Sequence, residues 1–177
     1  MPTRSGDRLD LSPIGAIFHV LRTGDDTNGE MLEMEWELAP HSSGTPVHVH
    51  PQATESYDVI EGRLDVFVDG TWRTLSQGES ASVPRGVPHT FRNPDATVTR
   101  VRNIHAPAMR FGEYFGTIHR IVESGAVEHD RMTLKAMLYL ALVMVRFKPE
   151  IISVRPPHFV IVLSAGLAKI LGYDQRQ

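Results

Sequence analysis

The sequence contains no cysteine among its 177 residues. This excludes a disulfide framework, a thiolate metal site and a cysteine nucleophile. The absence also fits a reducing compartment, and we expect a cytoplasmic protein. Any metal site must then be built from histidine and oxygen ligands.

Long hydrophobic runs are absent as well. The longest, Ala136 to Val145, is shorter than the roughly 18–20 apolar residues that span a bilayer. The N-terminal stretch MPTRSGDRLDLSPIG is interrupted by acidic residues and does not read as a signal peptide. We therefore expect no membrane span.

Positive charge is not in excess, since the sequence has 18 Lys and Arg and 21 Asp and Glu, which gives a formal net charge of -3. Nucleic-acid-binding domains normally show a basic balance with clustered Lys and Arg, so no nucleic-acid partner is expected. The length suits one domain with a real core, 41% of the residues being hydrophobic.

Short β-strands are predicted from Pro13 to about Ala106. In residues 32–38 apolar side chains alternate with Glu33, Glu35 and Glu37, which is typical of a half-buried strand. Arg100 and Arg102 share this period and are expected opposite the acidic face. Asp69-Gly70 between two apolar runs predicts a hairpin. Many short strands at such spacing favour an antiparallel sandwich or barrel.

The pattern then changes to helical spacing, with helices predicted over residues 111–123, 131–147 and 159–171. The last two are apolar on nearly every side, which is typical of buried helices. We therefore divide the chain into an N-terminal arm (1–12), a β-barrel (13–112) and C-terminal helices (113–177). These helices are expected to pack on the barrel or across a homodimer interface.

The segment PVHVHPQATESYDVIEG, residues 46–62, brings three metal-ligating residue types together. His48 and His50 are two residues apart, so a strand would point both to one face. Glu55 follows a turn and begins the next strand, where it can reach the same pocket.

A second segment, GESASVPRGVPHTFRN, offers His89 at the start of another strand. Three imidazoles and one carboxylate suit Fe, Mn, Ni, Cu or Zn. Four protein ligands would leave one or two positions open for water or substrate.

The two segments together resemble the paired signatures of the cupin superfamily. His48, His50, Glu55 and Gly62 match the first signature, except that Ser42 stands where its leading glycine is expected and Gly44 lies nearer the histidines. The second signature is matched at every fixed position, by Gly78, Pro84, Gly86, His89 and Asn93.

This resemblance implies a double-stranded β-helix (jelly roll) with a divalent metal inside, held by His48, His50, Glu55 and His89. It implies turn roles for the matched glycines, Pro84 and Asn93. The segment PAMRFGEYF loosely resembles the helix start downstream of quercetinase-type cupins, with Gly112 inserted before the glutamate.

Other residues are weaker candidates. Tyr57 should share a face with Glu55 and act as an acid, a base or a substrate-orienting hydroxyl, unless it is an ordinary half-buried tyrosine. Trp36 and Phe91 form either an aromatic wall for substrate or part of the core. His105 is read as a surface histidine rather than a group at the barrel mouth, and Arg85 as a solvated turn residue rather than an anion contact.

Two function classes remain open, because a fold does not fix a function. One is a small dioxygenase-like oxidoreductase for an aromatic or enol-type substrate, in which Glu55 is a ligand and, when free, a general base. The other is a non-catalytic module that binds metal or a small molecule. A metal-dependent isomerase would need more polar residues lining the barrel than the sequence offers.

Overall fold

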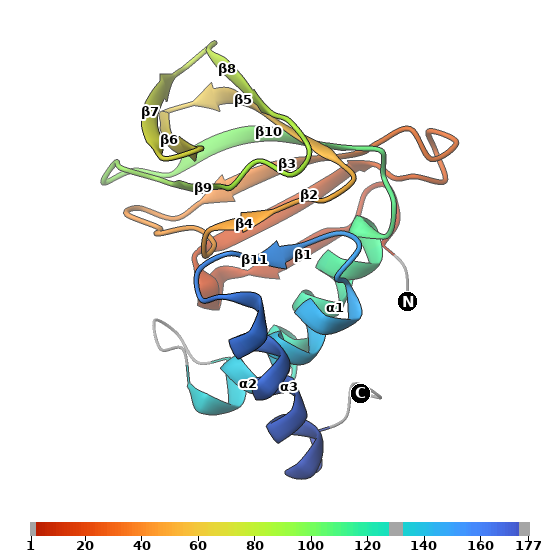
Figure 1. Cartoon of the computed structure of the whole chain (residues 1–177). Coiled ribbons are helices and arrows are strands. Elements are labelled where there is room, and N and C mark those ends of the chain that lie inside the picture. The colour runs from red at the N-terminus through yellow and green to blue at the C-terminus, as the bar shows by residue number, and fades with distance from the viewer. Residues whose placement is uncertain (1–2, 128–132, 174–177) are drawn as a thin grey trace.

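The protein, seen in a computed structural model, consists of a β-barrel followed by a helical layer (Figure 1). The structure describes residues 3–127 and 133–173. The strands are β1 (Arg8–Leu11), β2 (Ala16–Arg22), β3 (Leu32–Leu38), β4 (His48–Val49), β5 (Thr54–Glu61), β6 (Arg63–Val68), β7 (Thr71–Ser76), β8 (Ser80–Val83), β9 (His89–Arg92), β10 (Thr99–Ala106) and β11 (Ile152–Ser153). The helices are the short 3-10 helix η1 (Ser12–Ile14), α1 (Phe111–Glu123), α2 (Leu134–Arg146) and α3 (His158–Ile170).

The strands form two antiparallel sheets that enclose one core. The six-stranded sheet has the order β1-β2-β3-β10-β5-β8, and the five-stranded sheet has the order β11-β4-β9-β6-β7. The chain crosses from one sheet to the other between β3 and β4, and back again between β4 and β5. The predicted jelly-roll barrel with a C-terminal helical extension is therefore confirmed.

Strand β3 shows why the barrel closes on itself. Leu32, Met34 and Trp36 are buried inside the barrel, whereas Glu35 and Glu37 point outward. The acidic side meets arginines from neighbouring strands, as predicted, with Arg100 bonded to Glu35 at 2.5 Å. Alternation of period two thus gives the sheet an apolar face for the core and an ion-paired outer face.

One tight turn and one close backbone approach help to hold the strands in register. Asp69 and Gly70 both have positive φ angles, 46° and 91°, so the predicted β6–β7 hairpin is confirmed. A Cβ on Gly44 would lie 2.0 Å from the carbonyl oxygen of Phe91, which leaves no room for a side chain. Gly44 is thus a glycine demanded by close packing, even though Ser42 occupies the position expected from the signature.

The predicted N-terminal arm is wrong for its last residues. Strand β1 pairs with β2 through the whole of residues 8–11. Leu9 and Leu11 are buried in the core, while Arg8 is exposed. The alternation RLDL is short but has the period of a strand, and this strand extends the sheet.

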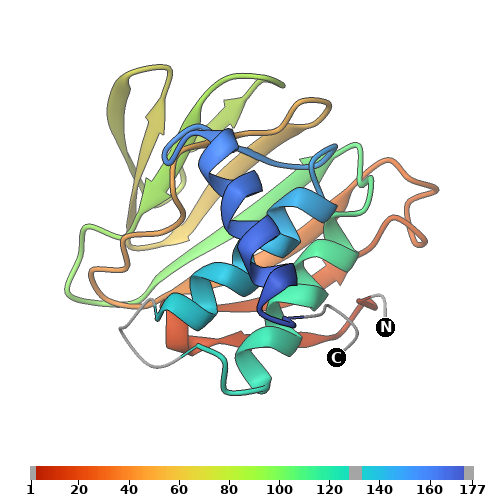
Figure 2. The same ribbon diagram turned by 60° about the horizontal axis from the view of Figure 1, so that its bottom comes forward.

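The helices lie together on one side of the barrel, and α3 is the outermost (Figure 2). Helix α1 contacts β1 and α2, and α2 contacts α3. The predicted helix over residues 111–123 is confirmed, and α2 and α3 match the other two closely, although residues 131–132 of the predicted second helix lie outside the described part. In the described ranges, no helix combines the length and apolarity needed to cross a membrane.

Candidate metal centre

Four side chains from both sheets meet inside the barrel. Their candidate ligand atoms all lie within 4.8 Å of one another, and the four residues, each at most 4% exposed, are His48, His50, Glu55 and His89. His48 on β4 pairs directly with His89 on β9 in the five-stranded sheet, and Glu55 faces them from β5 in the six-stranded sheet. The structure therefore brings together the set that the sequence predicts.

Each of the three histidines is oriented by a backbone carbonyl. His48 Nδ1 lies 2.9 Å from the oxygen of Pro46, and His89 Nδ1 lies 2.8 Å from that of Val87. His50 Nδ1 lies 2.7 Å from the oxygen of Glu150. A carbonyl oxygen only accepts, so Nδ1 must carry the proton in each ring. In the neutral imidazole, Nε2 then carries the free lone pair, and this is the nitrogen that can bind a metal.

The carboxylate of Glu55 is held at both oxygens. Asn103 donates its side-chain amide to Oε1 at 2.8 Å, and His105 Nε2 lies 3.4 Å from the same oxygen. Oε2 lies 3.0 Å from His50 Nε2 and 2.8 Å from His89 Nε2. This arrangement favours a fixed ligand over a carboxylate that swings free.

The charges around the site follow from burial and from these contacts. Burial, with the neighbouring imidazoles of His89 and His50, holds the pKa of His48 well below its usual value. Burial acts to raise the pKa of Glu55, but the surrounding histidines outweigh it and the pKa lies well below its usual value. A neutral imidazole and an ionised carboxylate are the protonation states that metal binding needs.

His89 behaves differently. Burial lowers its pKa, but the contact with Glu55 outweighs burial, so the net shift is upward. His89 Nε2 lies 2.8 Å from Glu55 Oε2, so a proton on this nitrogen would be shared with the carboxylate. A metal cation at this point would take the place of that proton, and the three-nitrogen, one-oxygen donor set fits Fe, Mn, Ni, Cu or Zn.

The reading of His105 as a surface residue is wrong. The side chain is 1% exposed, packs on Phe111 with ring centroids 4.2 Å apart, and faces Glu55. Burial lowers its pKa to about 3. Asn103, two residues earlier on β10, was not singled out from the sequence at all. The period-two alternation of Val101, Asn103 and His105 is the signal that places all three inside.

The aromatic candidates lie deeper in the barrel. Trp36 and Phe91 are nearly fully buried, with ring centroids 5.1 Å apart, and Phe18 stacks on Trp36 at 4.7 Å. Tyr57 is also buried, and burial with the charge of Glu55 raises the pKa of its phenol well above the usual value. Two polar atoms here, Tyr57 OH and Trp36 Nε1, have no hydrogen-bond partner among the described residues.

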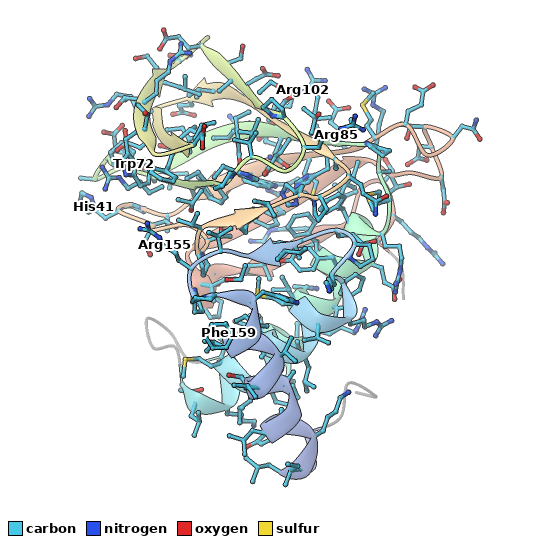
Figure 3. The ribbon with its side chains drawn as sticks, viewed as in Figure 1. His41, Trp72, Arg85, Arg102, Arg155 and Phe159 are labelled. Atoms are coloured by element: carbon cyan, nitrogen blue, oxygen red, sulfur yellow. The ribbon has the colours of Figure 1, made fainter. Side chains whose placement is uncertain are left out.

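Arg85 is not part of this group. It is exposed in the turn before β9, and Figure 3 labels it there. The interpretation of Arg85 as a solvated turn residue therefore fits the structure.

Comparison with known proteins agrees with this architecture. Residues 34–105 match the family model described as Cupin domain. Quercetin 2,3-dioxygenase from Bacillus subtilis (strain 168) is 32% identical over 73 residues, which cover 41% of this chain and 21% of that protein. The HTH-type transcriptional regulator SutR from Escherichia coli (strain K12) is 39% identical over 72 residues, covering 40% and 36% of the two chains. The chain thus spans only part of the length of these relatives.

Solved structures share the fold at low sequence identity. An RmlC-like cupin from Shewanella frigidimarina superimposes with a TM-score of 0.51 at 24% identity, covering 60% of this chain and 87% of that one. KdgF from Halomonas sp. superimposes with a TM-score of 0.50 at 20% identity, covering 57% and 86%. At this level of identity the likenesses concern the fold alone.

Proposed function

Because the barrel of this chain is a cupin domain, we propose that it binds one divalent transition metal through His48, His50, Glu55 and His89. The observation that supports this most directly is the convergence of lone pairs. His50 and His89 both donate Nδ1 to carbonyls, yet both present Nε2 to the same oxygen of Glu55 at 3.0 and 2.8 Å. Acceptors that face one another need a proton or a cation between them.

The chemistry that we assign to this centre is that of a small oxidoreductase, dioxygenase-like, for a compact aromatic or enol-type substrate. A bound metal of this kind polarises a substrate oxygen or binds O₂ in an open position. The partial match to a quercetin dioxygenase favours this class. Glu55 would hold the metal in place, and a substrate proton would go to it only in a state in which it has left the metal.

Two unpartnered donors, Tyr57 beside Glu55 and Trp36 in ring contact with Tyr57, support a substrate position inside the barrel. Tyr57 OH stays protonated because of its raised pKa, so it can donate to a substrate oxygen. Trp36 Nε1 can do the same from β3. Phe18 and Phe91 both pack against Trp36, which leaves its N–H edge rather than its face for a ligand. We therefore propose Tyr57 as a substrate-orienting group and Trp36 as a hydrogen-bond donor, with Phe91 shaping the pocket.

A non-catalytic binding function is the second candidate. The partial match to the transcriptional regulator SutR favours it, since this name describes regulation and not turnover. In that case the same centre would hold a metal or a small ligand without reaction. The cytoplasmic location stays a prediction under either function.

We also propose a homodimer. Of the thirteen exposed large hydrophobic side chains in the described ranges, nine lie in α2, in α3 or directly after α3: Leu134, Met137, Phe159, Val160, Val162, Leu163, Leu167, Ile170 and Leu171. Phe159 marks this surface on the helical layer in Figure 3. Exposed apolar side chains gathered in this number on two neighbouring helices are typical of an interface.

The test of the metal proposal is the metal content of untagged protein, measured by mass spectrometry, beside His50→Ala and His89→Ala. We expect near-stoichiometric metal in the parent and little or none in both variants. Mutation of a residue that only supports a ligand typically weakens metal affinity by about 10–100-fold, so loss of the ligand itself should weaken it by at least about 100-fold. His19→Gln is the control, since His19 contacts Glu37 on the outer sheet face. O₂ consumption with enol substrates then separates the two functions. A parent that stays metal-free after refilling with Fe, Mn, Ni, Cu and Zn would reject the proposal.

A further inference from the structure

The chain returns to the metal centre after the barrel, where Glu150 meets His50, a residue 100 positions earlier in the sequence. Between α2 and α3, residues 147–155 form what we call the C-terminal strap. Its strand β11 pairs with β4, so that Ser153 lies opposite His48 and Ile152 opposite Val49 (Figure 1). The backbone N–H groups of Val154 and Arg155 both donate to the carbonyl of Val47, at 2.9 and 3.1 Å. The strap is therefore hydrogen-bonded to the strand that carries the first histidine.

The strap also contacts the second histidine directly. His50 Nδ1 donates to the carbonyl of Glu150 at 2.7 Å. His48 and His89 instead use carbonyls two residues before them, at Pro46 and Val87. Any chain that forms β4 and β9 can therefore orient His48 and His89 locally, whereas His50 depends on a remote segment.

The strap is well placed to act as a rigid support. Phe147 and Ile151 are buried in the main core, and the Phe147 ring packs against Tyr114 of α1 with centroids 5.6 Å apart. Ile151 N–H donates to the carbonyl of Phe147 at 2.9 Å. Ser153 Oγ donates to the carbonyl of Pro156 at 2.6 Å. The Glu150 carbonyl is thus held between two fixed ends.

We infer that the C-terminal strap is a working part of the metal centre, because the Glu150 carbonyl sets the tautomer and ring orientation of His50. This inference rests on the proposed metal function. The strap lies outside residues 34–105, which match the cupin family, so the centre is completed by the extension that follows the barrel. Loss of a group that orients a metal ligand in this way typically weakens metal affinity by about 10–100-fold.

Two variants loosen the strap without removing a large core side chain. Val154→Pro removes the N–H that donates to Val47, and residue 153 is in a strand, the conformation that a following proline tolerates. Glu150→Gly frees the backbone at the carbonyl itself and removes a carboxyl whose Oε2 has no partner in the described ranges. Leu142→Ala is the matched control, since it weakens the separate α2–α3 cluster and does not touch the strap.

The readouts are Zn²⁺ affinity, by competition with a chromophoric chelator, and the imidazole tautomers of the metal-free protein, by long-range nitrogen–proton NMR. We expect the parent to show His50 as the Nδ1–H tautomer. Both strap variants should bind Zn²⁺ about 10–100-fold more weakly and show His50 as a tautomer mixture, with His48 and His89 unchanged. Leu142→Ala should lower the unfolding temperature yet bind Zn²⁺ as the parent does.

Zn²⁺ binding should also slow amide hydrogen exchange in residues 147–155, because coupling between two sites is reciprocal. Strap variants that bind Zn²⁺ like Leu142→Ala, or unchanged exchange in the strap on Zn²⁺ binding, would overturn the inference. A parent that binds no metal at all would instead reject the proposed function, and the tautomer of His50 in the metal-free protein would still test the strap.

Discussion

Asn103 Nδ2 lies 2.8 Å from Glu55 Oε1, and this contact decides which way the carboxylate faces. On β10, His105 lies opposite Glu55 of β5, and Asn103, two residues earlier, lies opposite Tyr57. The Asn103 amide therefore reaches the Glu55 carboxylate across the two strands at a slant. Because Asn103 and His105 occupy Oε1, the other oxygen is left to His50 and His89. The orientation of the one anionic ligand thus depends on an amide that carries no charge.

The first prediction concerns this amide. Asn103→Ala should weaken Zn²⁺ binding by about 10–100-fold, because Glu55 loses its main orienting contact. It should also lower the free energy of unfolding by about 1–3 kcal/mol, since a buried carboxylate loses a hydrogen bond. Chelator competition and urea unfolding measure the two effects. Ser56→Ala is the control, because Ser56 lies beside Glu55 on β5 but points outward to Ser82. Equal Zn²⁺ affinity in both variants would contradict the prediction.

The sequence predicts most of this site because strand geometry is local. His48 and His50 share a face through the period of two, and the spacing to Glu55 and His89 matches a known pair of signatures. The same local rule predicts the β6–β7 hairpin from Asp69-Gly70 and the helix over residues 111–123 from its apolar spacing.

What the sequence does not predict are contacts between distant segments. The β11–β4 pairing joins two strands of two residues each, too short to have a period. The group that orients His50 is the backbone carbonyl of Glu150, which is the same whatever side chain stands there. His105 is a different case. Its alternation with Val101 and Asn103 predicts an inward side chain, but its position at the end of β10 is one where a surface turn is also expected.

The second prediction is a loss of stability of the metal-free protein in mild acid. The pKa values of His48 and His105 are lowered, the latter to about 3, so below pH 6.5 the unfolded chain binds protons there that the folded chain does not. Stability from these two groups falls as the pH falls. The raised pKa of His89 works in the opposite direction, but only above pH 6.5, because below that value His89 is protonated in the folded and the unfolded chain alike.

Below pH 6.5, His48 and His105 each lower the free energy of unfolding by up to about 1.4 kcal/mol per pH unit, so the loss between pH 7 and pH 5 is up to about 4 kcal/mol. Urea unfolding at both pH values measures it. His105→Gln removes one of the two lowered groups and should flatten the dependence. The prediction is wrong if metal-free parent protein is as stable at pH 5 as at pH 7.

The third prediction separates the role of Tyr57 from the fold. Its hydroxyl has no hydrogen bond of ordinary length in the described ranges, and Glu55 is the group whose charge acts on it, so Tyr57→Phe removes at most a weak contact with Glu55. The free energy of unfolding should change by less than about 1 kcal/mol or increase. If the centre turns over a substrate, the rate should fall by about 100-fold or more, as expected for a lost proton donor. Thermal unfolding and steady-state rates measure the two effects, and a clear loss of stability would show that the hydroxyl has a structural partner.

The last prediction concerns the apolar surface of α3. Leu163 and Ile170 are 69% and 84% exposed, and Lys169 is the only charged residue of the helix. A second copy of the chain that covers this surface would bury most of the exposed large hydrophobic side chains at once. We therefore expect a dimer in sedimentation velocity at micromolar concentration, and a monomer for Leu163→Glu, because a buried unpaired carboxylate is costly in an interface. Val98→Glu, at an equally apolar but remote exposed position, should stay dimeric. A parent that sediments as a monomer would contradict the proposed homodimer.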